Sequence, residues 1–193
     1  MYKRHTLRNL EKWLFQKKVI VLYGARQVGK TTIAKKLNEK YKGIYLNCER
    51  EEVKNLFLSL NPEKIIEFIG NKKFIVLDEA QKISSIGEVL KLLIDSYPER
   101  QFLATGSSSF DLANQTGEPL TGRKITFELH PLSLHEISEN RLYLQNQLES
   151  FLLYGMYPDI VKTGELDKKR KKLDELSGDY LYKDVLEFEN LKK

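Results

Sequence analysis

Short apolar runs alternate with amphipathic stretches along most of this chain. Four of the runs are short and apolar, as buried strands are. They predict strands at residues 19–22, 44–46, 74–77 and 102–104. Between these runs, apolar residues recur every three or four positions, which is typical of helices that pack on a sheet. The recurrences predict helices at residues 7–15, 31–41, 51–58, 62–69 and 86–97.

The order of the elements predicts the fold class. Strands that alternate with helices form a mostly parallel sheet with helices on both faces. We therefore expect a three-layer α/β fold, in which ligands bind beyond the carboxyl ends of the strands. A strand-like run at residues 125–129 follows a short helix expected at 110–114, and further helices are expected at 142–153 and 166–191.

The segment after the first predicted strand carries the phosphate-binding pattern GxxxxGK[ST]. The pattern and the residue after it are Gly24, Ala25, Arg26, Gln27, Val28, Gly29, Lys30, Thr31 and Thr32. Glycine permits a tight turn, so backbone N–H groups face a phosphate while the following helix N-terminus adds a favourable dipole. The alternative is a glycine turn without function. Since a strand precedes the loop and a helix follows it, the pattern predicts binding of a nucleoside triphosphate.

Acidic residues follow the third predicted strand, where a phosphate loop needs a partner. Lys30 would reach the β- and γ-phosphates, while the Thr31 hydroxyl and Asp78 would hold Mg²⁺. The adjacent Glu79 would orient and deprotonate the attacking water. The alternative is a polar strand end whose acids cap the next helix. ATP and Mg²⁺ are therefore the predicted cofactors.

Three further residues are candidates for contact with the γ-phosphate. The fourth predicted strand is followed by Thr105 and Ser107, and a hydroxyl there would sense the triphosphate or simply cap a helix. Arg123 ends a polar loop rich in Gly, Ser and Thr. Arginine stabilises charge on a transferring phosphoryl group, but an arginine beside a strand can also only pair with an acid.

Composition narrows the classes of protein. The 193 residues, 41% hydrophobic and 31% charged, suit one α/β domain with a small appendage. No apolar run approaches the ~20 residues of a membrane span, and the first residues lack the apolar core of a secretory signal. The single cysteine, Cys48, excludes an internal disulfide, and the three histidines fit no metal spacing. We expect a cytoplasmic protein that does not act at a membrane.

The charge of the chain leaves its partners open. The net charge of +5 permits a nucleic-acid partner without indicating one. The dense basic cluster at residues 168–172 has the composition of a solvated helix end. Binding of a phosphate backbone there is the alternative.

Several motifs occur in an order that resembles a known family. They are the loop at 23–32, Asp-Glu-Ala-Gln at 78–81, the serine-rich tip at 105–109, Gly122-Arg123, His130-Pro131-Leu132-Ser133 with Glu136, and Tyr-Gly-Met-Tyr-Pro at 154–158. The combination is similar to the prokaryotic AAA-type ATPases with an RQVGKTT loop, in which the AAA domain joins a domain of unknown function (DUF4143). Ala25 stands where these proteins usually have proline.

The resemblance, which covers nearly the whole chain, implies more than the motifs alone. It implies a five-stranded P-loop NTPase core of AAA type, with an additional strand between the strand of the loop and the strand of Asp78. It implies that Arg123 serves as an arginine finger or sensor. It also implies a core at residues 1–139, followed by a helical lid or linker at 140–193 that leads into a further domain.

The sequence therefore predicts an AAA-like domain that binds and hydrolyses ATP and acts as a nucleotide-driven conformational switch. ATP is favoured over GTP because the Asn-Lys-x-Asp element of GTPases is absent. A nucleotide-gated binding module, for instance on DNA, with little turnover is one alternative, and a small-molecule kinase is another. A homo-oligomer, a DNA or protein client, and action of Arg123 within its own subunit or on a neighbour all stay open.

Overall fold

The computed structural model describes residues 2–106 and 119–178. Its contacts divide the chain into two compact units. The larger unit consists of Thr6–Ala25 and Gly29–Leu129, and the smaller unit of Met1–His5, Arg26–Val28 and His130–Lys193. The sequence-based division at residues 139 and 140 stays a prediction. Ser107 and the helix expected at 110–114 lie outside the described residues.

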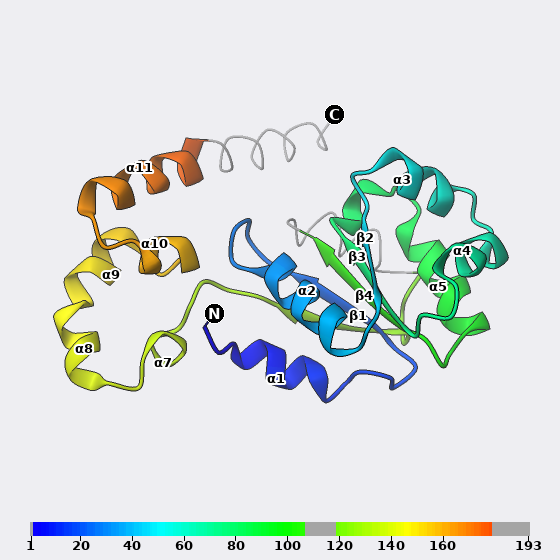
Figure 1. The fold of residues 1–193 in the computed structure, drawn as a ribbon, viewed down its shortest axis with the longest axis horizontal. Coiled ribbons are helices and arrows are strands. Elements are labelled where there is room, and N and C mark those ends of the chain that lie inside the picture. The colour runs from blue at the N-terminus through cyan, green and yellow to red at the C-terminus, as the bar shows by residue number, and fades with distance from the viewer. Residues whose placement is uncertain (1, 107–118, 179–193) are drawn as a thin grey trace. The chain divides into compact units, whose positions relative to one another are not determined.

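A five-stranded sheet forms the centre of the larger unit (Figure 1). Its strands are β1 (Val19–Tyr23), β2 (Ile44–Asn47), β3 (Phe74–Asp78), β4 (Gln101–Gly106) and β5 (Lys124–Glu128). The spatial order is β2-β3-β4-β1-β5, and all four neighbouring pairs are parallel. The predicted α/β class is confirmed, and β4 is the additional strand between β1 and β3. All carboxyl ends therefore meet at one edge of the sheet.

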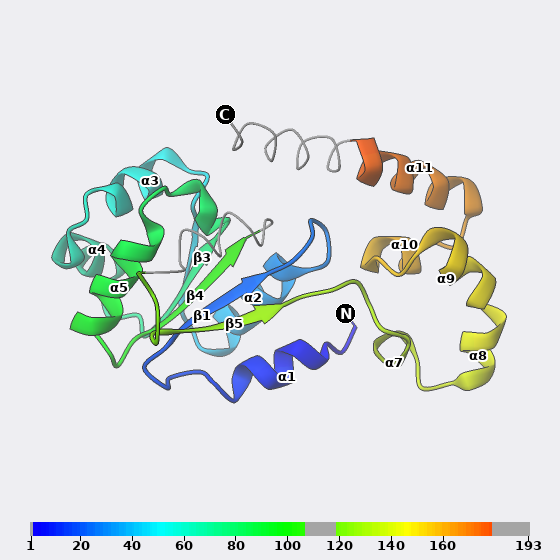
Figure 2. The same ribbon diagram turned by 180° about the vertical axis from the view of Figure 1, so that it is seen from behind.

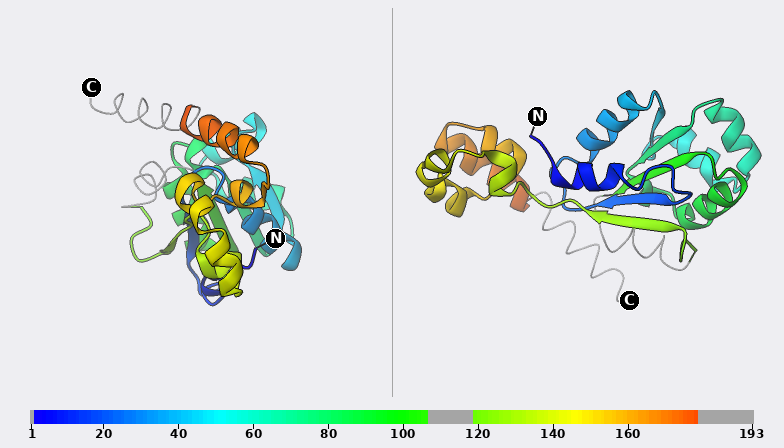
Figure 3. Two further views of the ribbon diagram at one scale, coloured as in Figure 1. Left: turned by 90° about the vertical axis from the view of Figure 1, so that its left-hand side faces the viewer. Right: turned by 90° about the horizontal axis from the view of Figure 1, so that it is seen from below.

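Helices cover both faces of this sheet, because the central strands are apolar on both sides. The helices are α1 (His5–Glu11), α2 (Lys30–Lys40), α3 (Glu51–Leu58), α4 (Pro62–Ile69) and α5 (Ile86–Ser96), with a 3₁₀ turn η1 (Ala80–Lys82). Val19 and Val21 of β1 join the core formed with α3, α4 and α5, and the intervening Ile20 is equally buried. Alternate side chains of a strand point to opposite faces. Helices α1 and α2 lie on the side away from α3–α5 (Figures 1 and 3).

The first helix is shorter than its pattern predicts. The prediction of a helix over residues 7–15 is wrong in extent, since α1 ends at Glu11 and the chain continues in turns. Phe15 and Lys17 have positive φ angles of 59° and 55°, which a right-handed helix does not accommodate. Leu14 nevertheless remains buried. The apolar spacing therefore predicted correctly that Leu14 is buried, although the helix has already ended at Glu11.

The described part of the smaller unit is helical after residue 133 (Figure 2). Its helices are α7 (Leu134–Ile137), α8 (Arg141–Asn146), α9 (Leu148–Tyr154), α10 (Pro158–Lys162) and α11 (Leu166–Leu176). The prediction of one continuous helix at residues 142–153 is wrong, because a turn at Gln147 separates α8 from α9. None of the helices in the described ranges has both the length and the apolarity to cross a bilayer.

The close approach of β3 to the start of β2 generates a prediction about stability. A Cβ atom added at Gly43 would lie 2.3 Å from the backbone oxygen of Phe74, whereas one added at Gly164 would have no neighbour within 4 Å. Because a backbone atom cannot move aside cheaply, Gly43→Ala should lower the free energy of unfolding by about 1–3 kcal/mol. Gly164→Ala is the matched control in denaturant unfolding, and equal stability of the two variants would contradict the packing at β2.

Candidate functional site

The loop between β1 and α2 has the backbone of a phosphate-binding loop. Gly24, directly after β1, has a φ of 149°, and a Cβ atom there would lie 2.1 Å from the backbone oxygen of Leu129. Gly29, directly before α2, has a left-handed φ of 104°. Both positions therefore need glycine, one because of a close approach and both because of their backbone angles. The sequence placed the turn correctly.

Lys30 is buried beneath this loop. Its Nζ atom donates hydrogen bonds to the backbone oxygens of Gly24 and Ala25, at 2.9 and 2.8 Å. Lys30 is also the first residue of α2, an 11-residue helix whose N-terminal N–H groups carry partial positive charge. The loop thus combines an ammonium group with a helix N-terminus, an arrangement that favours an anion with several oxygens.

The two predicted magnesium ligands lie in contact. The Thr31 hydroxyl is 3.0 Å from Oδ2 and 3.2 Å from Oδ1 of Asp78, and the Asp78 carboxylate is buried at the end of β3. The contact joins the first turn of α2 to a strand that is separated from β1 by β4. Residues 47 positions apart in sequence thereby form one polar cluster at the carboxyl edge of the sheet.

Two more hydroxyl groups face the same carboxylate. Thr105, at the end of β4, donates to Oδ1 of Asp78, and Tyr45 of β2 donates to Oδ2. Burial, followed by the hydrogen bond to Asp78, raises the pKa of Tyr45 above its ordinary value, so the phenol stays a donor. The sequence indicated Thr105 but not Tyr45. In the β2–β3 register Tyr45 pairs with Val76, two residues before Asp78 and on the same face.

Glu79 occupies an unusual backbone conformation beside this cluster. Its φ of 55° is left-handed, which is uncommon for a residue other than glycine and is concentrated at functional sites. Its N–H group donates to the Thr105 hydroxyl at 3.4 Å, and Nε2 of Gln81 donates to its Oε2 at 2.5 Å. Gln81 therefore orients the carboxylate that the sequence predicts as the base, a role that no sequence pattern indicated.

Arg123 lies at the amino ends of the strands, opposite the ends that carry the phosphate loop. Its backbone oxygen accepts from the N–H of Val19 at the start of β1, whereas the phosphate loop follows the end of β1. Five strand residues span roughly 16 Å, which an arginine side chain does not bridge. Its Nε atom instead donates to Asp95 at 2.7 Å, and the side chain is 40% exposed. The structure therefore does not bring Arg123 to the phosphate loop of its own chain.

A buried arginine in the smaller unit holds the tip of the loop. Arg4 donates from Nη1 to the backbone oxygen of Val28 at 3.1 Å and from Nη2 to that of His130. Its Nε atom lies 3.4 Å from the carboxylate of Glu136, and both side chains are at least nine-tenths buried. Glu136 also completes a capping box with Ser133 at the start of α7. Arg4 thus contributes backbone support for the loop that local sequence patterns did not reveal.

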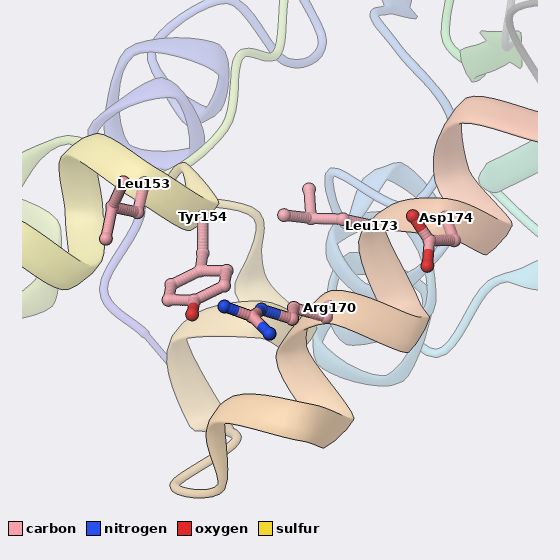
Figure 4. Close-up of a pocket in the computed structure, with 5 residues that line it drawn as sticks. All are labelled: Leu153, Tyr154, Arg170, Leu173 and Asp174. Carbon is pink, nitrogen blue, oxygen red and sulfur yellow. The ribbon is translucent and has the colours of Figure 1, made fainter.

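The basic cluster at residues 168–172 is largely engaged within the smaller unit. Lys168 pairs with Glu165, Lys169 donates to Ser150 at 2.6 Å, and Lys172 donates to Thr163 at 3.1 Å. Arg170 lines a pocket of about 330 Å³ between α9 and α11, where Figure 4 shows its guanidinium directed toward Tyr154. The other lining residues are Leu153, Leu173 and Asp174. Because these cationic side chains contact groups of their own unit, the proposal that they bind the phosphate backbone of a nucleic acid is weakened.

The chemistry of the donors fits a magnesium–nucleotide complex. Within residues 2–106 and 119–178, no group of three or more His, Cys, Asp and Glu side chains is placed to hold a metal ion. Mg²⁺ seldom needs such a cage, because it is usually held by one or two carboxylates together with substrate phosphates. Thr31 and Asp78 offer a hydroxyl and a carboxylate beside the loop. They suit an ion that arrives with its nucleotide.

Known proteins share both the sequence pattern and the fold. The AAA domain family matches residues 16–138. Protein MJ1544 of Methanocaldococcus jannaschii is 29% identical over 93% of this chain and 44% of its own length. Protein Rv2008c of Mycobacterium tuberculosis is 29% identical over 76% of this chain and 33% of its own length. This chain thus spans less than half of either relative.

A solved structure supports the same assignment at the level of the fold. The Walker-type ATPase PABY2304 of Pyrococcus abyssi superimposes with a TM-score of 0.66 at 17% identity, and the match covers 98% of this chain and 76% of that one. At this identity the similarity concerns the fold alone. Together with the phosphate loop, Asp78 and the strand order, the family match leads to one conclusion: the chain belongs to the AAA domain family of P-loop ATPases.

Proposed function

We propose that this domain binds ATP with Mg²⁺ at the loop between β1 and α2, hydrolyses it, and acts as a nucleotide-driven conformational switch. One observation carries the proposal: the contact of the Thr31 hydroxyl with the buried carboxylate of Asp78. This hydroxyl–carboxylate contact lies next to Lys30 and the glycine loop, which supports a magnesium–nucleotide site there. Few arrangements other than a nucleotide site bring these groups to the carboxyl edge of a parallel sheet.

The residues of the loop would bind the phosphates by charge and by backbone donors. Lys30 already has its ammonium group under the turn, where it would exchange the oxygens of Gly24 and Ala25 for phosphate oxygens. Thr31 would offer its hydroxyl oxygen to the metal while it keeps its hydrogen bond to Asp78. When bound, Mg²⁺ would supply neutralisation of the phosphate charge.

Glu79 is the residue best suited to take a proton from water. Gln81 orients its carboxylate, and the Thr105 hydroxyl fixes its backbone, so a general base would be held on two sides. A base of this kind contributes about 100- to 10,000-fold to a rate. Hydrolysis to free phosphate, without a second acceptor, distinguishes this function from that of a small-molecule kinase. The biological client of the switch stays a prediction.

Arg123 would act on a neighbouring subunit rather than on its own nucleotide. It is exposed at the amino edge of the sheet, away from the phosphate loop of the same chain. We therefore infer a homo-oligomer in which Arg123 leaves Asp95 and approaches the γ-phosphate of the adjacent protomer. An arginine in this role would stabilise the charge of the transferring phosphoryl group.

The loop predicts how nucleotide affinity responds to loss of its lysine. Charge-assisted hydrogen bonds contribute about 1.5–3 kcal/mol each, so Lys30→Met should weaken ATP binding about 10- to 100-fold. Isothermal titration calorimetry with ATP and Mg²⁺ measures the change. Lys36→Met, on an exposed part of the same helix, is the matched control. Equal affinities of the two variants would show that the loop is not the nucleotide site.

If Glu79 is the general base, its loss should slow ATP hydrolysis but leave ATP binding unchanged. Glu79→Gln should bind ATP as the wild type does and release phosphate about 100- to 10,000-fold more slowly, because the amide cannot accept the proton. Phosphate release is measured without any added acceptor. The control is Glu63→Gln, an exposed glutamate on α4. Wild-type turnover in Glu79→Gln would remove this residue from the mechanism.

The position of Arg123 predicts a concentration-dependent activity. Phosphate release per protomer should rise with protein concentration in the wild type, whereas Arg123→Ala should bind ATP but lose about 1,000-fold or more in rate. Asp95→Asn breaks the same ion pair but leaves the arginine in place. An equal loss in Asp95→Asn would indicate that the ion pair, and not a finger, matters.

A further inference from the structure

The carboxylate of Asp78 is held by donors from three separate elements. Thr31 of α2 contacts both oxygens, Thr105 of β4 donates to Oδ1, and Tyr45 of β2 donates to Oδ2. A carboxylate has about four acceptor positions on its two oxygens. Thr105 and Tyr45 thus donate to one oxygen each, and the single Thr31 proton lies between the two oxygens, so the three donors restrain the plane of the group and not only its position.

Tyr45 differs from the other two donors in its role. The Thr31 hydroxyl is the predicted metal ligand, and the Thr105 hydroxyl also accepts the N–H of Glu79. The Tyr45 hydroxyl is directed to Asp78 alone among the described hydrogen bonds. A change at Tyr45 therefore alters the carboxylate without disturbing the predicted base or the phosphate loop directly.

The ring of Tyr45 is supported by the helix that carries Thr31. Lys35 Nζ lies 5.4 Å from the centroid of the Tyr45 ring, within the range of a cation–π contact. Lys35 follows Thr31 by one helical turn, so both residues lie on the same face of α2. One face of α2 therefore contacts both Asp78 and the tyrosine that orients it.

We propose that Tyr45 is a positioning residue that orients Asp78 for magnesium and so determines how strongly the metal tightens nucleotide binding. This inference rests on the proposed function. The phenol would act through Asp78 and Thr31 and would not touch the nucleotide. Without it, Oδ2 loses one of its donors and the carboxylate gains freedom to rotate. Loss of such an outer hydrogen bond typically lowers metal affinity about 10- to 100-fold.

The test uses the full chain and measures how strongly Mg²⁺ tightens nucleotide binding, with an analogue that is not hydrolysed. Calorimetry gives the Kd of AMPPCP, a non-hydrolysable ATP analogue, first in EDTA and then with Mg²⁺. The ratio of the two Kd values reports how much the metal contributes to binding. Tyr45→Phe keeps the ring but removes the hydroxyl, and it should lower this ratio about tenfold while the Kd in EDTA stays at the wild-type value.

The chain contains a matched control. Tyr23 ends β1, and its hydroxyl also donates to a carboxylate, that of Glu128, at 3.1 Å. Tyr23→Phe removes the same atom from a tyrosine that does not contact Asp78, so its ratio should equal that of the wild type. Thermal unfolding checks that each variant is folded. If Tyr45→Phe is destabilised, both Kd values are measured for all variants at a temperature below its unfolding midpoint, with the same expected loss.

The outcomes separate the inference from the function on which it rests. A lower ratio in Tyr45→Phe but not in Tyr23→Phe supports the role of Tyr45. A ratio in Tyr45→Phe that equals or exceeds the wild-type ratio overturns it, as does an equal loss in both variants. If the wild type binds AMPPCP neither in EDTA nor with Mg²⁺, the proposed nucleotide site itself is wrong.

Discussion

The hydrogen bonds to the buried carboxylate of Asp78 are the interaction on which the site depends. A buried carboxylate is costly unless it accepts several hydrogen bonds or lies beside a cation. Here three hydroxyls, from Thr31, Tyr45 and Thr105, satisfy it. They come from α2, β2 and β4, so the carboxylate holds the end of β3 to the elements around it. The same group thus joins these elements and is the predicted ligand of magnesium.

The parallel sheet explains why these groups meet and why Arg123 does not join them. Every strand ends at one edge, so the residues that follow β1, β3 and β4 converge there irrespective of their separation in sequence. Arg123 precedes β5, which places it at the opposite edge beside Asp95. At that edge the Arg123 side chain is partly exposed. The geometry thus connects the direction of the strands with the inference of an oligomer.

Local patterns predicted elements better than their ends. The helices at 51–58 and 62–69 were predicted with their observed bounds, and for the second of them Pro62 and Gly70 mark the start and the stop. The helix at 7–15 was wrong in extent, and the helix at 142–153 was wrong in continuity, since it is divided into two. In both cases the apolar spacing continued while the backbone turned, and burial alone does not require a continuous helix. Strand β4 runs from Gln101 to Gly106 and is longer at both ends than the predicted strand at 102–104, because pairing with its neighbours extends beyond the apolar run.

The sequence by itself determined the fold class, the phosphate loop and the candidate acidic residue at the end of β3 that Thr31 contacts. These features are encoded by residues close together in the chain and by spacing that one strand, turn and helix impose. Only the tertiary structure decided that Tyr45, Gln81 and Arg4 support the site. Their roles depend on which strands are neighbours and which backbone oxygens are buried. Those are long-range contacts, and no local periodicity records them.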